Sequence, residues 1–365
     1  MIIDAHVHFT PPALKQQLTT MGEPYVKMLL AGDGSIQDWV SAEKMIADMD
    51  RAGIDKVLLV GEYYQQHENC VMRNNQSIDL VNRYPDRILS LAIVSPNAGQ
   101  AAVDELNRCL DAGLIGLGEM NPYAQNFRLD DLIFSRLAEV CIERNVPINL
   151  HVGEEVGNWY TGKSTTPLRE YADLAQRFPA LKLIFAHWGG GLIFYELMPQ
   201  VRKQLANVWY DTAASPLLYP TKRIFRTALT CIDPAKILYG SDYPLRIYPR
   251  KMKTADFEPF LAAIRKQKLD CEQAVFGENF MAMLAQASQP KSIRRPHVEQ
   301  MTVRGLVRQA PQSAEILARY NLPTHDSALP AWEPIAQAAA ARGLSDAAQS
   351  ELMEELSQFI AEEHG

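Results

Sequence analysis

Short apolar runs alternate with longer amphipathic stretches along most of this chain. The runs are rich in valine, isoleucine and leucine, which is typical of strands that are buried on both faces. The stretches between them carry apolar residues at helical spacing, so the pattern predicts βαβ units around a parallel sheet. Candidate strands lie at residues 2–7, 56–60, 88–93, 114–119, 147–151, 182–186, 208–211 and 237–240. Eight such strands predict an α/β fold, a closed (β/α)₈ TIM barrel.

Helix signals between these strands support the alternation. The segment Ser41–Lys44 opens an amphipathic run that ends at Ala52 and Gly53. A glycine after the last periodic residue is a common helix stop, because it adopts the left-handed conformation easily. The same ending recurs at Asp111–Gly113.

The pattern changes near residue 288. The segment Gln289–Pro296 is polar and basic, with prolines near both ends and no periodicity, which predicts a linker at residues 288–297. Apolar residues then recur at helical spacing between Met301 and Ile360. We therefore expect a barrel over residues 1–287 and a small all-helical domain over residues 298–365.

Composition narrows the class of partner. The chain has 365 residues, of which 47% are hydrophobic, and this suits a barrel-sized domain with a small appendage. Its net charge of -7 gives no basic footprint, so we expect no nucleic acid and no membrane as partner, but a small-molecule substrate. The first residues lack a basic, apolar leader, and the five cysteines lack paired spacing. We expect a cytoplasmic protein with reduced, chemically quiet thiols.

Histidines and acids gather at one predicted rim. His6 and His8 are two residues apart on the first predicted strand, so both side chains face the same side. By itself this pair also fits a chance surface pair. However, His151, His187 and Asp242 each lie at or just beyond the end of a later predicted strand, where a barrel places its catalytic groups. Neutral imidazoles and a carboxylate suit zinc or another first-row divalent ion.

In order along the chain, these motifs resemble those of the amidohydrolase superfamily. They are His6-Val7-His8, Asn149-Leu150-His151, Ala186-His187-Trp188-Gly189-Gly190-Gly191 and Gly240-Ser241-Asp242-Tyr243-Pro244, with Tyr84-Pro85-Asp86-Arg87 before the third strand. The likeness covers the chain to about residue 285 and is strongest for the branch that includes aminocarboxymuconate-semialdehyde decarboxylase. It implies a divalent metal ion, which we expect to be Zn²⁺.

The resemblance also implies roles for individual residues. It makes His6, His8, His151 and Asp242 ligands of the ion, with His187 beside it. Asp242 would take the proton of a metal-activated water, and His187 would polarise a substrate carbonyl or act as an acid or base.

Glu119, at the end of the fourth predicted strand, leaves the number of ions open at one or two. Its Gly-Glu phrase is similar to that of the two-metal deoxyribonuclease branch, where this glutamate is a ligand. An equally good alternative is a carboxylate that only supports the ligands by hydrogen bonding.

Substrate contacts are harder to predict, because loop residues are often merely solvated or packed. The loop after the second strand offers Glu62, Tyr63 and Tyr64. Our candidates for substrate binding are Trp159 as an aromatic wall, Arg246 for a carboxylate, and in addition Tyr243, His67 and Arg128.

The C-terminal helices resemble a small module of unknown role that often carries cysteines. Here the segment Asn321–Asp326 occupies the place of those cysteines without a thiol. We therefore expect a packing or oligomerisation role for this domain and a homo-oligomeric protein.

Three functions remain open at this point. Our first hypothesis is a metal-dependent hydrolase of a small-molecule ester, lactone or amide, because Glu119 hints at a hydrolytic branch. The alternative is a nonoxidative decarboxylase of a carboxylated aromatic or dienoic substrate. The third is a non-catalytic sensor or scaffold, which is disfavoured because every expected ligand is present.

Overall fold

The computed structural model describes residues 1–287, 298–324 and 333–363. The predicted linker, residues 288–297, lies outside the described residues, and so do His325 and Asp326. The chain divides into two compact units: Met1–Arg128 with Arg136–Pro290, and Leu129–Ser135 with Lys291–Gly365. The short segment Leu129–Ser135 in the second unit is a feature that the sequence did not predict.

The first unit is built on parallel strands. In the described residues these are β1 (Ile3–His8), β2 (Lys56–Val60), β3 (Ile88–Ser90), β4 (Leu117–Met120), β5 (Pro147–Leu150), β6 (Lys182–Phe185), β7 (Val208–Asp211) and β8 (Ile237–Leu238). Each overlaps one of the predicted strands, and every pairing between them is parallel.

Single bridges close these strands into a ring. Hydrogen bonding joins them in the orders β1-β2-β3 and β4-β5-β6-β7-β8. Ala92, just after β3, pairs with Leu117 of β4, and Val7 of β1 pairs with Tyr243 beyond β8. These pairs connect the two sheets at both seams, so the strands form the closed barrel that the sequence predicts.

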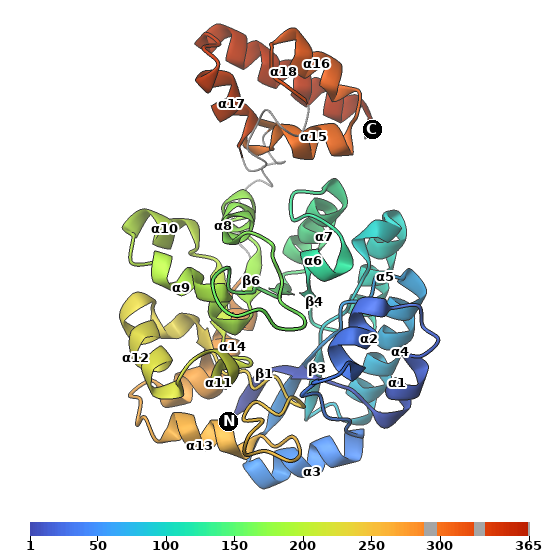
Figure 1. The fold of residues 1–365 in the computed structure, drawn as a ribbon, viewed down its shortest axis with the longest axis vertical. Helices are drawn as coiled ribbons and strands as arrows, with labels where there is room; N and C mark the ends of the chain where they lie inside the picture. Colours follow the sequence, from blue (N-terminus) through green and yellow to red (C-terminus); the bar gives the residue numbers. More distant parts are fainter. Residues whose placement is uncertain (288–297, 325–332, 364–365) are drawn as a thin grey trace. The chain divides into compact units, whose positions relative to one another are not determined.

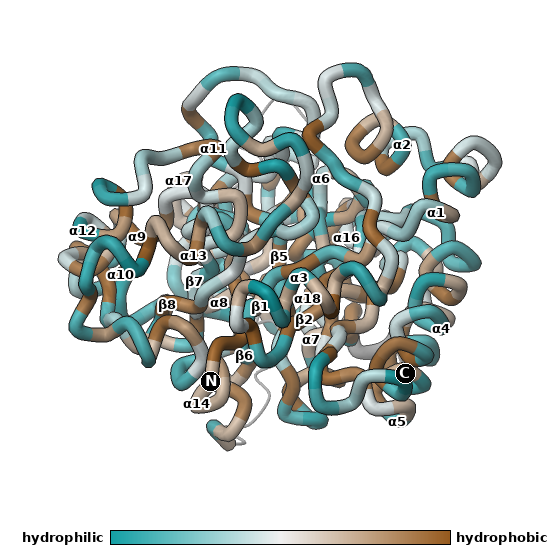
Figure 2. Tube along the Cα trace, turned by 90° about the horizontal axis from the view of Figure 1, so that it is seen from below, coloured by the Kyte–Doolittle hydropathy of each residue, from teal (hydrophilic) through white to brown (hydrophobic). Residues whose placement is uncertain are grey.

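Helices surround the barrel (Figure 1). They are α1 (Pro12–Gln17), α2 (Pro24–Ala31), α3 (Ala42–Ala52), α4 (His67–Arg83), α5 (Gln100–Asp111), α6 (Pro122–Gln125), α7 (Leu132–Glu143), α8 (Leu168–Arg177), α9 (Leu192–Tyr195), α10 (Pro199–Gln204), α11 (Ser215–Leu218), α12 (Thr221–Cys231), α13 (Glu258–Arg265) and α14 (Asn279–Ala285), with short helical turns such as η2 (His187–Gly191) between them. Along α4 and α12, hydrophilic and hydrophobic residues alternate (Figure 2), as expected of helices with one face in solvent. In the described part of the chain, no helix is both long and apolar enough to cross a bilayer.

The predicted helix signals act as expected. The Ser41 hydroxyl accepts a hydrogen bond from the backbone N–H of Lys44 and caps the start of α3. Gly53 ends the helix at a φ of 70°, a conformation that glycine adopts without strain.

The barrel interior is filled by apolar side chains. One buried cluster combines Ala5 of β1, Leu58 of β2, Ile184 of β6 and Leu238 of β8 with Phe280 of α14. Because β2 and β6 lie opposite one another in a ring of eight strands, their shared cluster lies inside the ring. The barrel is therefore a packed core, and ligands must bind at its rim.

The C-terminal part of the second unit consists of α15 (Val303–Gln309), α16 (Ser313–Arg319), α17 (Ile335–Ala341) and α18 (Asp346–Glu363). Its core contains the fully buried side chains of Leu317, Ile335 and Leu356. The hydroxyl of Thr302 accepts a hydrogen bond from the Gly305 N–H and caps α15. These helices thus have an apolar core of their own.

Candidate metal centre

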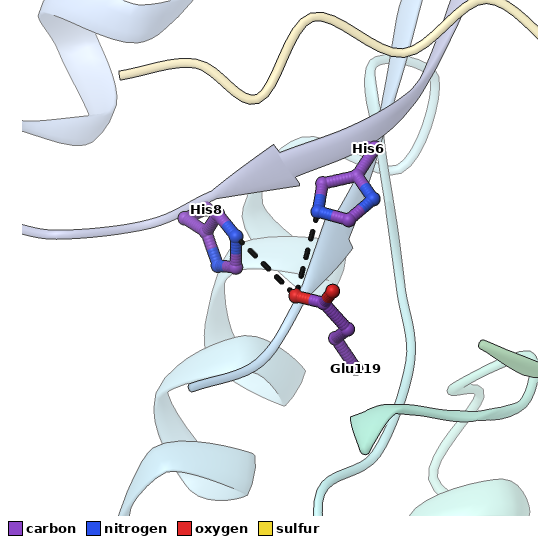
Figure 3. A group of neighbouring side chains, drawn as sticks. All are labelled: His6, His8 and Glu119. Carbon is purple, nitrogen blue, oxygen red and sulfur yellow. Dashed lines mark ion pairs between the residues drawn. The ribbon is translucent and has the colours of Figure 1, made fainter. Parts of the chain in front are cut away.

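The carboxyl ends of the strands bring together the six residues predicted for the metal centre, Glu119 included. His6 and His8 lie on β1 and point toward Glu119 of β4 (Figure 3). His151 follows β5 directly, His187 opens the turn after β6, and Asp242 lies beyond β8. All come from the same end of parallel strands, so residues far apart in sequence meet at one rim.

Four of these side chains form a first group of donor atoms. Oε2 of Glu119 lies 3.5 Å from Nε2 of His6 and 3.7 Å from Nε2 of His8. Oδ1 of Asp242 lies 3.3 Å from the same atom of His8. Two atoms bound to one zinc ion at roughly 2.1 Å stand about 3–4 Å apart, so this spacing suits ligation of a single ion.

A second group shares the same glutamate. Oε1 of Glu119 lies 3.0 Å from Nδ1 of His151 and 3.6 Å from Nε2 of His187. The two histidine nitrogens are 3.2 Å apart. The candidate ligand atoms of His6, His8 and Glu119 all lie within 4.8 Å of one another, and so do those of Glu119, His151 and His187. Glu119 thus offers one oxygen to each group.

The hydrogen bonds of His6 indicate whether the residues of the centre can bind a cation. Its Nδ1 lies 2.9 Å from Oδ2 of Asp211, while its buried Nε2 has no hydrogen-bond partner. A metal-binding histidine commonly donates its other N–H to a carboxylate, which leaves a lone pair for the ion. The residues present therefore fit a divalent metal ion.

Burial and charge set the protonation of the site. Burial lowers the pKa of His151 below its ordinary value, which favours the neutral form that metals bind. Burial alone would raise the pKa of Glu119, but the charge of His6 and hydrogen bonds from His151 and His187 hold it well below the usual range. Glu119 is therefore ionised although it is fully buried.

His187 and Asp242 differ in charge. Burial would lower the pKa of His187, yet its hydrogen bond with Glu119 and the charges of Asp242 and Glu119 raise the pKa to about 9. Burial would raise the pKa of Asp242, but a hydrogen bond from His8 and the charges of His6, His8 and His187 lower it. At neutral pH the rim thus pairs a cationic His187 with an anionic Asp242.

Both of these residues hold an unusual backbone conformation. The φ of His187 is 58° and that of Asp242 is 67°, in the left-handed region that non-glycine residues avoid. Such a conformation costs of order 1 kcal/mol or more and persists where the surroundings impose it. The His187 N–H donates to Asp211, and the Asp242 N–H donates to the backbone oxygen of His6. These bonds hold both functional side chains at the rim.

A cavity of about 490 Å³ opens on this rim. His8, His151, His187 and Asp242 contribute its polar end. Its other lining is mainly apolar and aromatic and includes Met28, Leu29, Leu30, Ile36, Tyr63, Tyr160, Leu217, Leu218 and Leu245. Among the described residues that line it there is no lysine or arginine.

The five predicted substrate contacts do not line this cavity. Trp159 is 72% exposed, and the next residue, Tyr160, takes the place expected for it in the wall. Arg246 donates instead to the backbone oxygens of Ser35 and Ile36.

The other three predicted substrate contacts also lie in surroundings other than the cavity. The buried Tyr243 donates its hydroxyl hydrogen to Asp48, Arg128 lies 3.8 Å from Glu170, and His67 begins α4. Proximity in sequence to a catalytic motif does not set the direction of a side chain, so these residues have other partners.

Two residues of the centre were missed or undervalued. The Tyr63 hydroxyl lies 2.8 Å from Oε2 of Glu119 and 2.9 Å from Nδ1 of His151. In the sequence, Tyr63 is only one of several polar loop residues after the second strand. Asp211, the partner of His6, was noted only as the last residue of a strand. The signal that could have identified it is an acid at the end of the seventh strand, at the same rim as the histidines.

Comparison with known proteins agrees with this geometry. The sequence matches the amidohydrolase family model over residues 3–279. A similar curated protein is 2-amino-3-carboxymuconate-6-semialdehyde decarboxylase of Dictyostelium discoideum, which is 22% identical over 203 residues. That alignment covers 47% of this chain and 55% of the relative, so the chain spans about half the length of the curated protein it matches.

Solved structures show the same fold. Those of 5-carboxyvanillate decarboxylase from Sphingomonas paucimobilis (TM-score 0.62, 17% identity) and from Novosphingobium aromaticivorans (0.60, 16%) each match 78% of this chain, and 98% and 96% of their own. The second holds manganese and 4-hydroxy-3-methoxy-5-nitrobenzoic acid. A 2,6-dihydroxybenzoate decarboxylase bound to 2,6-dihydroxybenzoate matches 78% of this chain and 99% of its own, with a TM-score of 0.58 and 17% identity. With a family match over most of its length and this rim of histidines and acids, the chain belongs to the amidohydrolase family and is an enzyme of that superfamily.

Proposed function

We propose that this enzyme is a metal-dependent nonoxidative decarboxylase of a carboxylated aromatic or dienoic compound. The observation that carries the proposal is the cavity, whose apolar and aromatic walls end on the group of metal-binding residues. Similar proteins that carry decarboxylase names support it. The proposal reverses our first order of hypotheses, which placed hydrolysis ahead because of Glu119.

The lining of the cavity favours a flat, conjugated substrate. Side chains such as Leu29, Leu218 and Tyr160 offer apolar surface to a ring or a diene. A substrate carboxylate needs a positive partner, and the described lining residues include no lysine or arginine. The cationic His187 lies at the polar end, so the carboxylate is expected to point there.

The proposed ligands of the ion are His6, His8, His151 and Asp242, with Glu119 shared between the two donor groups. Imidazole and carboxylate suit Zn²⁺ and Mn²⁺, and manganese is the ion in one similar structure. A bound divalent ion would supply positive charge to hold the substrate carboxylate at this end of the cavity.

His187 is the proposed acid. Decarboxylation breaks the bond between the ring or diene carbon and the carboxylate, releases CO₂, and requires a proton at that carbon. With its pKa raised to about 9, His187 carries a proton at neutral pH, whereas the lowered pKa of Asp242 leaves that carboxylate ionised. His187 is therefore better suited to deliver the proton, and Asp242 to hold the ion and the charge of His187.

Hydrolysis remains the second candidate because of one specific observation. Both oxygens of Glu119 face histidines, one in each donor group, which is the arrangement expected of a carboxylate that bridges two ions. A two-ion centre suits esters, lactones and amides as substrates.

A direct comparison of products tests the proposal. The protein is loaded with Mn²⁺ or Zn²⁺ and offered carboxylated phenols and dienoic acids with a ¹³C-labelled carboxyl group, beside aryl esters, lactones and amides. We expect labelled CO₂ from at least one carboxylated substrate, loss of that activity in His6→Ala/His8→Ala, and retention in His67→Ala, which alters a histidine outside the cavity lining. Ester, lactone or amide cleavage without release of labelled CO₂ would establish hydrolysis instead.

A further inference from the structure

The carboxylate of Asp211 accepts hydrogen bonds from residues at several strand ends. It is the last residue of β7 and is fully buried. Its Oδ2 lies 2.9 Å from Nδ1 of His6 and accepts from the Asn149 amide at 3.4 Å. Its Oδ1 accepts from the backbone N–H groups of His187 and Ala213, both at 3.0 Å. One carboxylate thus contacts residues of β1, β5 and the turn after β6.

The bond to His6 decides which nitrogen of that ring faces the site. A carboxylate accepts hydrogen bonds but does not donate them, so Nδ1 of His6 must carry the hydrogen. A metal ion binds only the neutral imidazole, and in that form the other nitrogen holds the lone pair. That nitrogen, Nε2, is the one that lies 3.5 Å from Oε2 of Glu119 and has no hydrogen-bond partner.

The bond to His187 acts on the backbone. His187 holds a φ of 58°, so its peptide N–H needs a fixed acceptor to stay in this conformation. Oδ1 of Asp211 is that acceptor, and it also binds the N–H of Ala213, whose carbonyl oxygen lies 3.0 Å from Nδ1 of His187. The same carboxylate therefore orients a proposed ligand and the proposed acid.

We propose that Asp211 is a positioning residue of the metal centre, which sets the affinity for the divalent ion by fixing the tautomer and orientation of His6. The inference rests on the metal site of the proposed function. Asp211 itself is not a ligand in this proposal, because its oxygens are engaged by His6, Asn149 and two backbone N–H groups.

Replacement of Asp211 by asparagine separates shape from chemistry. The amide oxygen of the new side chain can still accept from the N–H groups of His187 and Ala213. Its NH₂ group then faces Nδ1 of His6 and donates to it, so His6 must carry its hydrogen on Nε2. The nitrogen that would bind the ion loses its lone pair, although the volume of the side chain hardly changes.

The test is calorimetric titration of chelator-treated protein with Mn²⁺, which requires no substrate and no turnover. We expect Asp211→Asn to weaken Mn²⁺ binding by about 10- to 100-fold. The matched control is Glu105→Gln, which alters another buried carboxylate, on α5, that is bound by Asn74 and Arg108. Glu105→Gln should lower the melting temperature but leave Mn²⁺ affinity unchanged, and equal affinities in Asp211→Asn and the unaltered protein would overturn the inference.

A double variant distinguishes an effect of Asp211 on Mn²⁺ binding through His6 from a merely structural effect. If Asp211 acts through His6, the variant His6→Ala/Asp211→Asn should bind Mn²⁺ as weakly as His6→Ala alone. A further loss of 10-fold or more in the double variant would contradict that route. If the unaltered protein binds neither Mn²⁺ nor Zn²⁺, the metal site of the proposed function and the role of Asp211 are refuted together, whereas normal binding in Asp211→Asn refutes only the latter.

Discussion

Removal of the His187 imidazole should abolish proton delivery without removing a proposed metal ligand. With a pKa of about 9, this histidine is about 99% protonated at pH 7, whereas an imidazole at the ordinary value of 6.5 would be about one quarter protonated. The surroundings of His187 therefore raise the fraction of the acid form about fourfold. A positioned general acid contributes roughly 10²- to 10⁴-fold to the rate, which is about 2.7–5.5 kcal/mol.

The sign of the pH dependence follows from the raised pKa. A required acid is present below its pKa and is lost as the pH rises through it, so kcat should fall above about pH 9. We expect His187→Asn to lower kcat by about 10²- to 10⁴-fold and to remove that basic limb. The assay is release of CO₂ by the Mn²⁺-loaded protein between pH 6 and pH 10.

His67→Asn is the matched control, because His67 begins α4 and lies outside the cavity lining. This variant should keep both the rate and the pH profile of the unaltered enzyme. A His187→Asn variant that retained kcat within about threefold, or that kept the basic limb, would refute the assignment of the acid, since a small loss is below the usual contribution of a general acid.

Three further changes test the centre and its support. Glu119→Ala should remove a ligand from both donor groups and lower the Mn²⁺ content of the purified protein, which elemental analysis measures. If Glu119 bridges two ions, the content should fall from two equivalents to at most one. An unchanged Mn²⁺ content would contradict ligation by Glu119. Tyr63→Phe removes the hydroxyl 2.8 Å from Oε2 of Glu119 and should lower kcat/KM by about tenfold; an unchanged value would show that this hydrogen bond is dispensable. Gly190→Ala should lower the free energy of unfolding by about 2–4 kcal/mol in chemical denaturation, because the φ of Gly190 is +59° and an added Cβ would meet the Gly153 oxygen at 2.4 Å. The control is Gly113→Ala, which should cost only about 1 kcal/mol because an added Cβ there meets no atom within 4 Å.

The sequence by itself determined the fold and most of the centre. Strand positions are encoded locally, because short apolar runs between amphipathic stretches suit only strands buried on both faces. Because the strands are parallel, the carboxyl ends of all of them lie at the same rim of the barrel. This is why His6, His8, His151, His187 and Asp242 could be brought together from sequence alone.

The substrate contacts could not be predicted in this way. Trp159 and Tyr160 are neighbours in a loop, yet only Tyr160 lines the cavity. A loop has no fixed periodicity, so sequence does not state which of two adjacent side chains turns inward. Arg246 has the charge expected of a carboxylate partner, but its guanidinium donates to backbone oxygens of a distant segment.

Only the tertiary structure decided which residues of the centre are joined by hydrogen bonds. His6 and Asp211 are 205 positions apart, and Tyr63 reaches Glu119 from 56 positions away. Hydrogen bonds between such residues depend on distances of a few tenths of an ångström, which arise from the packing of all the strands and leave no local pattern. The sequence therefore determined which chemical groups share the rim, whereas the folded barrel decided that Glu119 serves two donor groups and that Asp211 orients His6.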